Sequence, residues 1–338
     1  MGYFFNNPKV LSRSWYNLLP SSKLKKKSSK SVPFFDYKIA LFRDENGKAS
    51  ALYAYCPHMG ADLGIGKVLK NTLVCPYHKW AFNQEGKCTR VSGKIASIDN
   101  YHTISFPILE KYGFIWIFNG EKADFPFPEI PWTKNDHYIL SFPNNKMHCH
   151  PHIVGTNNPD FNHLETLHHF HLDNKPEQIR SKHQLIYKYK IQFKPKNIID
   201  KLFGLYFGTI YDFHVIQYGS NLIIMDISSK RYHFKTLIAL NPTVEGKTIS
   251  KFFLFLSKGK NLTRILGLNF LKLPFLLPSV LKIQLQDLPI YQNIQFKIPQ
   301  DEPTILNHIN LINSLGIFHP KDASRSIPST VNYLVSNN

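Results

Sequence analysis

Cys56-Pro57-His58 and Cys75-Pro76-Tyr77-His78, with sixteen residues between them, decide the fold of the first third of this 338-residue chain. Each stretch pairs one thiolate with one imidazole, as Cys-x-His in the first and Cys-x-x-His in the second. Two thiolates and two imidazoles form a metal-binding set, since both groups are good ligands for transition metals. The spacing of the four residues decides between the kinds of centre that use them.

A structural zinc site also uses two cysteines and two histidines, but it usually spaces them as C-x₂₋₄-C and H-x₃₋₅-H, which Cys-x-His does not fit. A Rieske [2Fe–2S] cluster holds one iron by two cysteines and the other by two histidines. Each stretch then supplies one ligand to each iron. The pattern favours a cluster bound by Cys56, His58, Cys75 and His78, and a zinc-stabilised binding module is the alternative.

The flanking sequence predicts that the ligands lie on loops between strands. Lys38–Arg43 and Ala51–Tyr55 read as strands around Asn46-Gly47, a strong hairpin signal. The remaining cysteines, Cys88 and Cys149, are expected to be free thiols in a reducing interior, because four cysteines do not make a disulfide framework.

Residues from about 14 to 120 resemble the Rieske domain of the Rieske-type non-heme iron oxygenases. In respiratory Rieske proteins two further cysteines form a disulfide across the cluster loops, and Ala61 and Tyr77 stand at those places here. That disulfide cannot form. This departure, with Trp80 two residues after the last ligand, points to the oxygenase type.

A second constellation, within Asn157–His168, reads as Asp160-x₂-His163-x₄-His168. Two imidazoles and one carboxylate on one face of Fe(II) leave positions open for dioxygen and substrate. Residues five apart lie about 140° apart on a regular helix. His163 and His168 can therefore hold one metal only if the helix ends or widens between them.

Other histidines lie nearby without fitting the motif. His169 and Glu165 are alternatives to His168 as ligand. His148, His150 and His152 alternate, so on a strand they would share one face. Most of these nearby histidines, His171 among them, are not expected to bind the metal.

The third iron ligand must be a carboxylate from elsewhere. Beyond Ile198 the candidates are Asp200, Asp212, Asp226, Glu245, Asp287, Asp301, Glu302 and Asp322. Gln286-Asp287-Leu288-Pro289-Ile290 resembles the stretch that carries this ligand in the steroid-hydroxylating branch of the family, which selects Asp287. Pro289 also indicates an unusual local backbone.

The resemblance implies that Asp160 bridges the two metal centres, with His78 and His163 as its partners. In the family the short electron path crosses between subunits of a head-to-tail trimer, so a homotrimer is implied. Asn157 is a weaker candidate for supporting the iron site, and Thr156 replaces the family's usual Glu.

The expected fold class is α+β, with a Rieske domain over 1–125, a proline-rich crossing over 126–132 and a catalytic domain over 133–338. The resemblance makes the first domain all-β and the second a helix-grip (START-like) fold. Strands are predicted at Leu185–Phe193, Leu222–Ile227 and Lys251–Leu256, and helices around 158–170 and 195–206.

No secretory signal opens the chain, so a cytoplasmic location is expected. The apolar run Leu262–Leu281 contains charges and prolines, and is expected to be a pocket cover, a membrane-surface contact or core rather than a membrane span. The net charge of +18 has coding bias as its first explanation and a docking face for an acidic electron donor as its functional one, while nothing else supports nucleic acid. The sequence has no complete dinucleotide-binding motif, so we do not expect the chain itself to bind NAD or flavin.

The resemblance implies the terminal oxygenase of a multicomponent monooxygenase, with one [2Fe–2S] cluster and one Fe²⁺ per chain. Electrons would come from NAD(P)H through a separate ferredoxin or flavin reductase. The motifs most resemble those of 3-ketosteroid 9-alpha-hydroxylases and cholesterol 7-desaturases, suggesting a sterol-like lipophilic substrate that is hydroxylated or desaturated. An aromatic-ether demethylase is an alternative, and a Rieske electron carrier with a non-catalytic lipid-binding domain is another.

Overall fold

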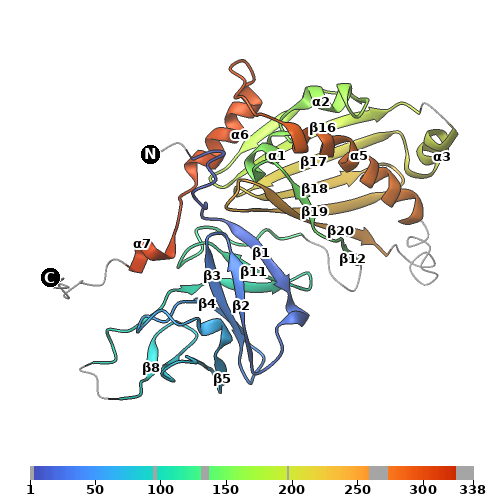
Figure 1. Ribbon diagram of the computed structural model, residues 1–338. Helices are drawn as coiled ribbons and strands as arrows, with labels where there is room; N and C mark the ends of the chain where they lie inside the picture. Colours follow the sequence, from blue (N-terminus) through green and yellow to red (C-terminus); the bar gives the residue numbers. More distant parts are fainter. Residues whose placement is uncertain (1–3, 94–96, 131–136, 196–197, 259–272, 325–338) are drawn as a thin grey trace. The chain divides into compact units, whose positions relative to one another are not determined.

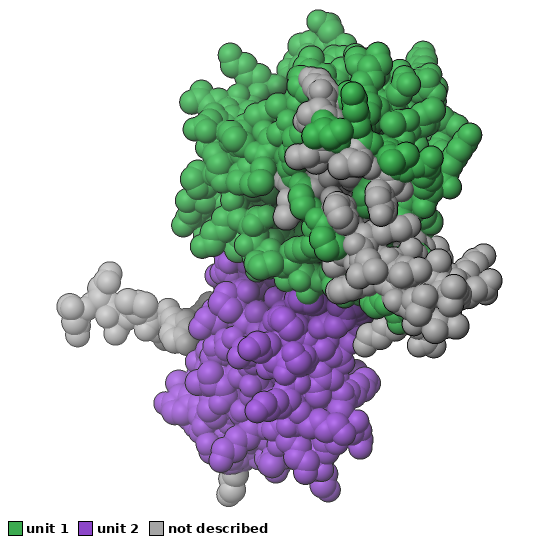
Figure 2. Space-filling view, turned by 90° about the vertical axis from the view of Figure 1, so that its right-hand side faces the viewer, with its two compact units in different colours: residues 1–9, 14–17, 125–316 green, residues 10–13, 18–124, 317–338 purple. Residues whose placement is uncertain are grey.

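The computed structural model describes residues 4–93, 97–130, 137–195, 198–258 and 273–324, and these fold into two units (Figures 1 and 2). Unit 1 contains Phe125–Gly316, and unit 2 contains Leu18–Asp124. The two ends of the chain are grouped with different units from those that the predicted domain boundaries give them. Residues up to Lys9 are grouped with unit 1, where the backbone N–H groups of Phe4 and Phe5 donate to Asn313 Oδ1. The chain from Ile317 is grouped with unit 2.

Unit 2 is built from short strands. One sheet has the order β2 (Ser28–Phe34), β3 (Tyr37–Arg43), β4 (Ala49–Tyr53) and β9 (Ser105–Phe106); another has β5 (Lys67–Leu69), β6 (Thr72–Val74), β7 (Ala81–Phe82) and β8 (Cys88–Arg90). A third sheet has the order β1 (Trp15–Pro20), β11 (Phe114–Phe118) and β10 (Ile108–Lys111), and the residues of β1 before Leu18 are grouped with unit 1. Two 3₁₀ turns, η1 (Ser21–Lys23) and η2 (Leu63–Ile65), and the short helix α7 (Pro320–Ser324) complete this set.

The predicted hairpin around Asn46-Gly47 is confirmed, with β3 and β4 antiparallel and Arg43 opposite Ala49. Gly47 has φ +92°, a left-handed conformation that glycine adopts without steric cost. The Asp44 side chain accepts from Lys48 N–H at 2.8 Å, which closes the turn. The second strand is two residues earlier than predicted, so Ala54–Cys56 already belong to the loop that follows it.

Unit 1 is organised around one antiparallel sheet. Its order is β12 (His137–Ser141), β20 (Thr248–Ser257), β19 (His233–Pro242), β18 (Leu222–Ser228), β17 (Ile210–Tyr218), β16 (Gln184–Phe193) and β14 (Phe170–Leu172), with β13 (Asn145–Met147) on β20 and β15 (Glu177–Arg180) on β16. Along β16 the buried side chains alternate, from Leu185 to Ile191. Period-two alternation places these residues on one face of the sheet, where they form the core.

The helices of unit 1 are α1 (Pro151–Thr156), α2 (Phe161–Thr166), α3 (Ile198–Phe207), α5 (Leu273–Asn293) and α6 (Pro303–Ser314). Figure 1 shows the long helix α5 crossing the sheet. The predicted α+β class is therefore confirmed. The helix predicted around 158–170 is shorter, because the chain leaves it after Thr166 and Phe170 pairs with Phe193 in β14.

The apolar run expected over Leu262–Leu281 divides at the start of α5. Residues 262–272 lie outside the described residues, whereas 273–281 form the first turns of α5. There Leu277 packs against the core of unit 1. Within the described part of the chain, no helix is both long and apolar enough to cross a membrane.

Three histidines are buried together in unit 1. The strand on which His148, His150 and His152 would alternate is absent: β13 ends at Met147, His150 caps α1 and His152 lies in its first turn. The three histidines of this group are His150, His152 and His308, and His308 lies in α6. Burial lowers the pKa of His150 and of His308 to about 4 each, so both are neutral in the folded protein at neutral pH.

We predict that acid destabilises unit 1 between about pH 6.5 and pH 4, because unfolded histidine has a pKa near 6.5 and the unfolded chain then binds more protons than the folded one. This stability is complete above about pH 6.5 and is lost as the pH falls. His308→Leu should remove about 1.4 kcal/mol of that dependence per pH unit. Hydrogen exchange of the α1 and α6 amides at pH 7 and pH 5 measures it, and equal acid sensitivity in both proteins would contradict the assignment.

Candidate metal centres

The two Cys/His stretches of unit 2 form loops with matching backbone hydrogen bonds. Cys56 N–H donates to Ala61 O, and Cys75 N–H donates to Trp80 O, at 2.9 and 2.7 Å. Each cysteine carbonyl also accepts from the residue four positions on, Gly60 or Lys79. Both of those residues have positive φ, +74° and +62°. The two loops are thus the same kind of turn, which presents a histidine two or three residues after the cysteine.

The thiols and the imidazoles differ in their exposure. Cys56 and Cys75 belong to the core of unit 2, whereas His58 and His78 are half-buried with ring centres 4.6 Å apart. Burial, with the neighbouring Cys75, raises the pKa of Cys56 to about 12. A bound iron must therefore displace the thiol proton, as metal binding by cysteine generally does.

The residues fit a two-iron cluster better than a single zinc ion. Ligand atoms of a tetrahedral zinc site lie about 3.5 Å apart, given bonds of 2.0–2.3 Å. Among the described residues, the group whose three donor atoms lie within 4.8 Å of one another is His163, His168 and Asp287. The donor atoms of the two cysteines and two histidines therefore do not converge on one point. Trp80 stacks on His58 at 4.2 Å, and its buried Nε1 has no hydrogen-bond partner. Cluster sulfurs are acceptors for such a donor.

In unit 1, Asp160 begins α2 and orients His163. The Asp160 carboxylate caps the helix by accepting from His163 N–H at 3.2 Å. The His163 ring contacts the Asp160 carbonyl oxygen through Nδ1. If Nδ1 carries the proton, it donates to this carbonyl and leaves Nε2 for a metal ion. Asp160 thus supports His163 through both its backbone and its side chain.

The helix ends and widens between His163 and His168, as the sequence requires for one shared metal. Leu167 N–H donates to His163 O at 2.9 Å, and His168 N–H approaches the same oxygen at 3.4 Å, an i→i−5 spacing. His169 then takes a positive φ of +59°, and the chain turns into β14. The rings of His163 and His168 consequently lie with their centres 5.2 Å apart.

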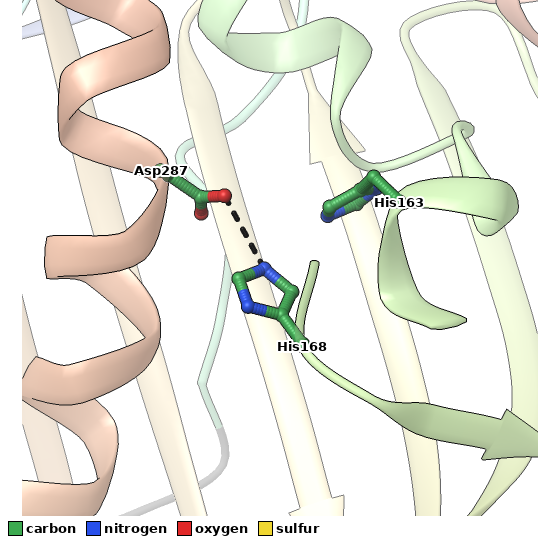
Figure 3. Close-up of side chains that lie close together, drawn as sticks. All are labelled: His163, His168 and Asp287. Atoms are coloured by element: carbon green, nitrogen blue, oxygen red, sulfur yellow. Dashed lines mark ion pairs between the residues drawn. The ribbon is translucent and has the colours of Figure 1, made fainter. Parts of the chain in front are cut away.

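Helix α5 brings Asp287 to these two histidines (Figure 3). Asp287 Oδ1 lies 3.2 Å from His168 Nε2, an ion-pair contact that joins α5 to the second histidine. One donor atom from each of His163, His168 and Asp287 lies within 4.8 Å of the other two. Two imidazoles and a carboxylate gathered in this way are a donor set that fits a divalent cation such as Fe²⁺.

The charges of the two histidines respond differently to this environment. Burial lowers the pKa of His163. Burial also acts to lower the pKa of His168, but hydrogen bonding to Asp287 and Gln286 outweighs it, so the pKa of His168 is raised. A cation held here would replace the proton that His168 shares with Asp287, so its binding would depend on pH.

Among the described residues, no donor atom of another sequence candidate joins this group, although His169 and Asp200 line the same cavity. Glu165 is exposed, and its Oε1 accepts from Leu172 N–H. Among the acids, Asp212, Asp226 and Glu245 form ion pairs with Lys190, Lys235 and Lys247, respectively.

Asn157 ends α1 and lines the cavity beside the three-residue group, and the Thr156 hydroxyl donates to Ile153 O. Both residues are thus near the centre without belonging to it.

A cavity of about 800 Å³ opens beside His163, His168 and Asp287. Aromatic and aliphatic side chains of the sheet form most of its wall, including Tyr189, Phe213, Ile223, Met225, Phe234 and Phe252. Residues of α5, among them Tyr291, contribute to the lining. Such a cavity binds lipophilic molecules of substantial size.

Sequence reasoning missed one residue of the site. Gln286 Oε1 lies 3.1 Å from His168 Nδ1, and Gln286 Nε2 approaches Leu167 O at 3.4 Å. Its position next to Asp287 was a signal, because a residue adjacent to a ligand is well placed to orient another ligand.

Comparisons with known proteins agree with this arrangement. The family model described as "Rieske [2Fe-2S] domain" matches residues 14–102. "Cholesterol 7-desaturase nvd 1" of Ciona intestinalis is 35% identical over 169 residues, 48% of this chain and 35% of the relative. "4beta-methylsterol monooxygenase" of Methylococcus capsulatus is 33% identical over 162 residues, 46% of this chain and 44% of the relative. The matched stretch thus spans less than half the length of these relatives.

The fold extends the similarity over both units. The crystal structure of dicamba monooxygenase bound to dicamba covers 94% of this chain and 99% of its own, with a TM-score of 0.60 at 18% identity. At that identity the likeness concerns the fold. The chain therefore contains a Rieske [2Fe-2S] domain, and its fold is similar to that of dicamba monooxygenase.

Proposed function

We propose that this chain is the terminal oxygenase of a multicomponent Rieske monooxygenase. The observation that carries the proposal is the group of His163, His168 and Asp287 at the wall of an apolar cavity, in a chain that also has a Rieske domain. Cys56, His58, Cys75 and His78 would hold the cluster. The group of His163, His168 and Asp287 would hold Fe²⁺. When bound, the cluster supplies stored electrons and the iron supplies oxygen activation.

The protein groups would position the ligands and exclude water. Asp160 holds His163, Gln286 holds His168, and the apolar walls of the cavity keep solvent from the reacting carbon. The Asp160 side chain is 32% exposed, so its carboxylate is available to a second partner. We infer that this partner is His78 of a neighbouring copy in a homotrimer, which would link the cluster of one subunit to the iron of the next.

The proposed substrate is a lipophilic, sterol-like molecule that is hydroxylated or desaturated. The size and apolar walls of the cavity support it, as do the sterol substrates named for the two relatives. An aromatic-ether demethylase is the second candidate, supported by the shared fold with dicamba monooxygenase. A Rieske carrier with a non-catalytic lipid-binding domain is less well supported, since it needs no group like His163, His168 and Asp287.

Electrons would arrive from NAD(P)H through a separate ferredoxin or flavin reductase in the cytoplasm. The cluster loops offer a contact surface, because Met59 and Tyr77, next to the two imidazole ligands, are 64% and 59% exposed. The net charge of +18 suits an acidic donor protein. Contact with a membrane surface would be compatible with a lipophilic substrate.

His163→Ala should abolish product formation while leaving the Rieske visible and EPR spectra unchanged, because it removes an iron ligand from unit 1 and leaves unit 2 intact. Iron content should fall from about three to about two per chain, as the two ligand sets require. His171→Ala, at an exposed histidine of the same region, is the matched control and should keep all three irons. Loss of the cluster signal in His163→Ala would refute the two-site assignment.

Gln286→Leu should weaken binding of the mononuclear iron by about 10- to 100-fold, because the His168 ring loses the acceptor that orients it. Chelator competition, with the cluster spectrum as internal reference, measures the affinity. Gln286→Glu keeps an acceptor oxygen and should restore most of the binding. Unchanged iron affinity in the leucine variant would show that the contact does not position the ligand.

Asp160→Asn should leave both metal centres loaded and stop electron flow between them. Asparagine is as good an N-cap as aspartate, so α2 should persist while the carboxylate charge is lost. Single-turnover product from enzyme with a reduced cluster, quantified by mass spectrometry, is the measurement. Product near the wild-type amount would refute the bridging role.

A further inference from the structure

The apolar sheet face under the cavity carries a buried hydroxyl group. Thr236 lies in the middle of β19, is 2% exposed and lines the cavity. Its neighbours in register on the adjacent strands are Met225 on β18 and Leu254 on β20, which are both apolar. Thr236 Oγ1 has no hydrogen-bond partner. Threonine at this position thus leaves a polar atom unsatisfied where valine would fill the same space.

Such an arrangement is unfavourable in the ligand-free protein. A buried hydroxyl loses its hydrogen bonds to water, and only a new partner compensates for that loss. Native structures contain few groups of this kind, and a missing ligand is one explanation. The cavity next to Thr236 is large enough to contain the missing partner.

The register of the sheet places Thr236 away from the iron-binding group. Thr236 pairs with Met225, Met225 with Val215, and Val215 with Tyr187 on β16. With strands about 4.8 Å apart, Thr236 and Tyr187 are separated by about 14 Å across the sheet. Phe161, two residues before His163, packs on Tyr187 with ring centres 6.0 Å apart. Thr236 therefore lies across the sheet from the segment that carries His163.

We propose that Thr236 Oγ1 hydrogen-bonds an oxygen atom of the substrate and so selects lipophiles with a hydroxyl or keto group remote from the oxidised carbon. A threonine hydroxyl both donates and accepts, so either oxygen function satisfies it. The inference deepens the proposed function, on which it rests for the identity of the cavity as the substrate site. It makes Thr236 a specificity-determining residue.

The test uses Thr236→Val and two ligands that differ by one hydroxyl, cholestan-3-ol and cholestane. Affinities for the metal-loaded protein are measured without reductant, by partition from cyclodextrin. Thr236→Val should weaken binding of the alcohol by about three- to tenfold and leave that of the hydrocarbon unchanged, because one hydrogen bond is lost. Equal effects on both ligands, or no effect on either, would overturn the proposal.

Thr248→Val is the matched control, because the Thr248 hydroxyl is also buried but donates to Cys149 O at 2.7 Å. Without ligand, Thr248→Val should lower the melting temperature, whereas Thr236→Val should leave it unchanged or raise it. A comparable loss in both variants would show that Thr236 already has a partner in the protein, and would overturn the inference.

Failure of cholestan-3-ol to bind wild-type protein would also overturn this inference, while the proposed oxygenase function would stand or fall separately. The iron content of His163→Ala and the single turnover of Asp160→Asn decide that function with whichever substrate yields product. A protein with both metal centres but no discrimination at Thr236 would remain an oxygenase with another specificity.

Discussion

The proposed mononuclear centre depends on how α2 ends. A regular helix would direct His163 and His168 about 140° apart, where no single ion could bind both. The carbonyl oxygen of His163 instead accepts a hydrogen bond from Leu167 N–H at 2.9 Å and is approached by His168 N–H at 3.4 Å. The second contact spans five residues rather than four and widens the last turn. This local change turns the second imidazole toward the first. The rest of the site is arranged around the pair that results.

Asp160 and Gln286 stabilise this arrangement from its two sides. Asp160 caps α2 and contacts the His163 ring, so the start of the helix and the first imidazole are held by one residue. Gln286 contacts both the His168 ring and the carbonyl of Leu167, where the helix widens. Because Gln286 precedes Asp287 on α5, one helix supplies both the carboxylate and the group that orients the second imidazole.

The candidate metal ligands of the two units lie in contrasting settings. In unit 2 the cysteines are in the core and the imidazoles are half-exposed, an arrangement suited to passing electrons outward. In unit 1 the three polar groups face an apolar cavity, an arrangement suited to chemistry that must exclude water. Burial raises the pKa of Cys56 and lowers the pKa of His163, so a metal bound in either unit would replace a proton from Cys56 and meet a neutral imidazole at His163.

Much of this protein could be predicted from local sequence. The spacing of Cys56, His58, Cys75 and His78 indicates a Rieske cluster, and Asn46-Gly47 predicts the hairpin before the first loop, because both signals depend on residues close in the chain. The five-residue interval between His163 and His168 even demanded an interrupted helix.

Tertiary structure decided what lies between distant segments. Eight acids beyond Ile198 were candidates for the third ligand, and only a resemblance to a family motif selected Asp287; the path of α5 across the sheet is what brings it to the histidines. The role of Gln286 and the lone hydroxyl of Thr236 were likewise invisible, since each depends on packing between elements far apart in sequence. Local order thus specifies the ligands that neighbouring residues can supply, and long-range packing specifies which remote side chains complete the site.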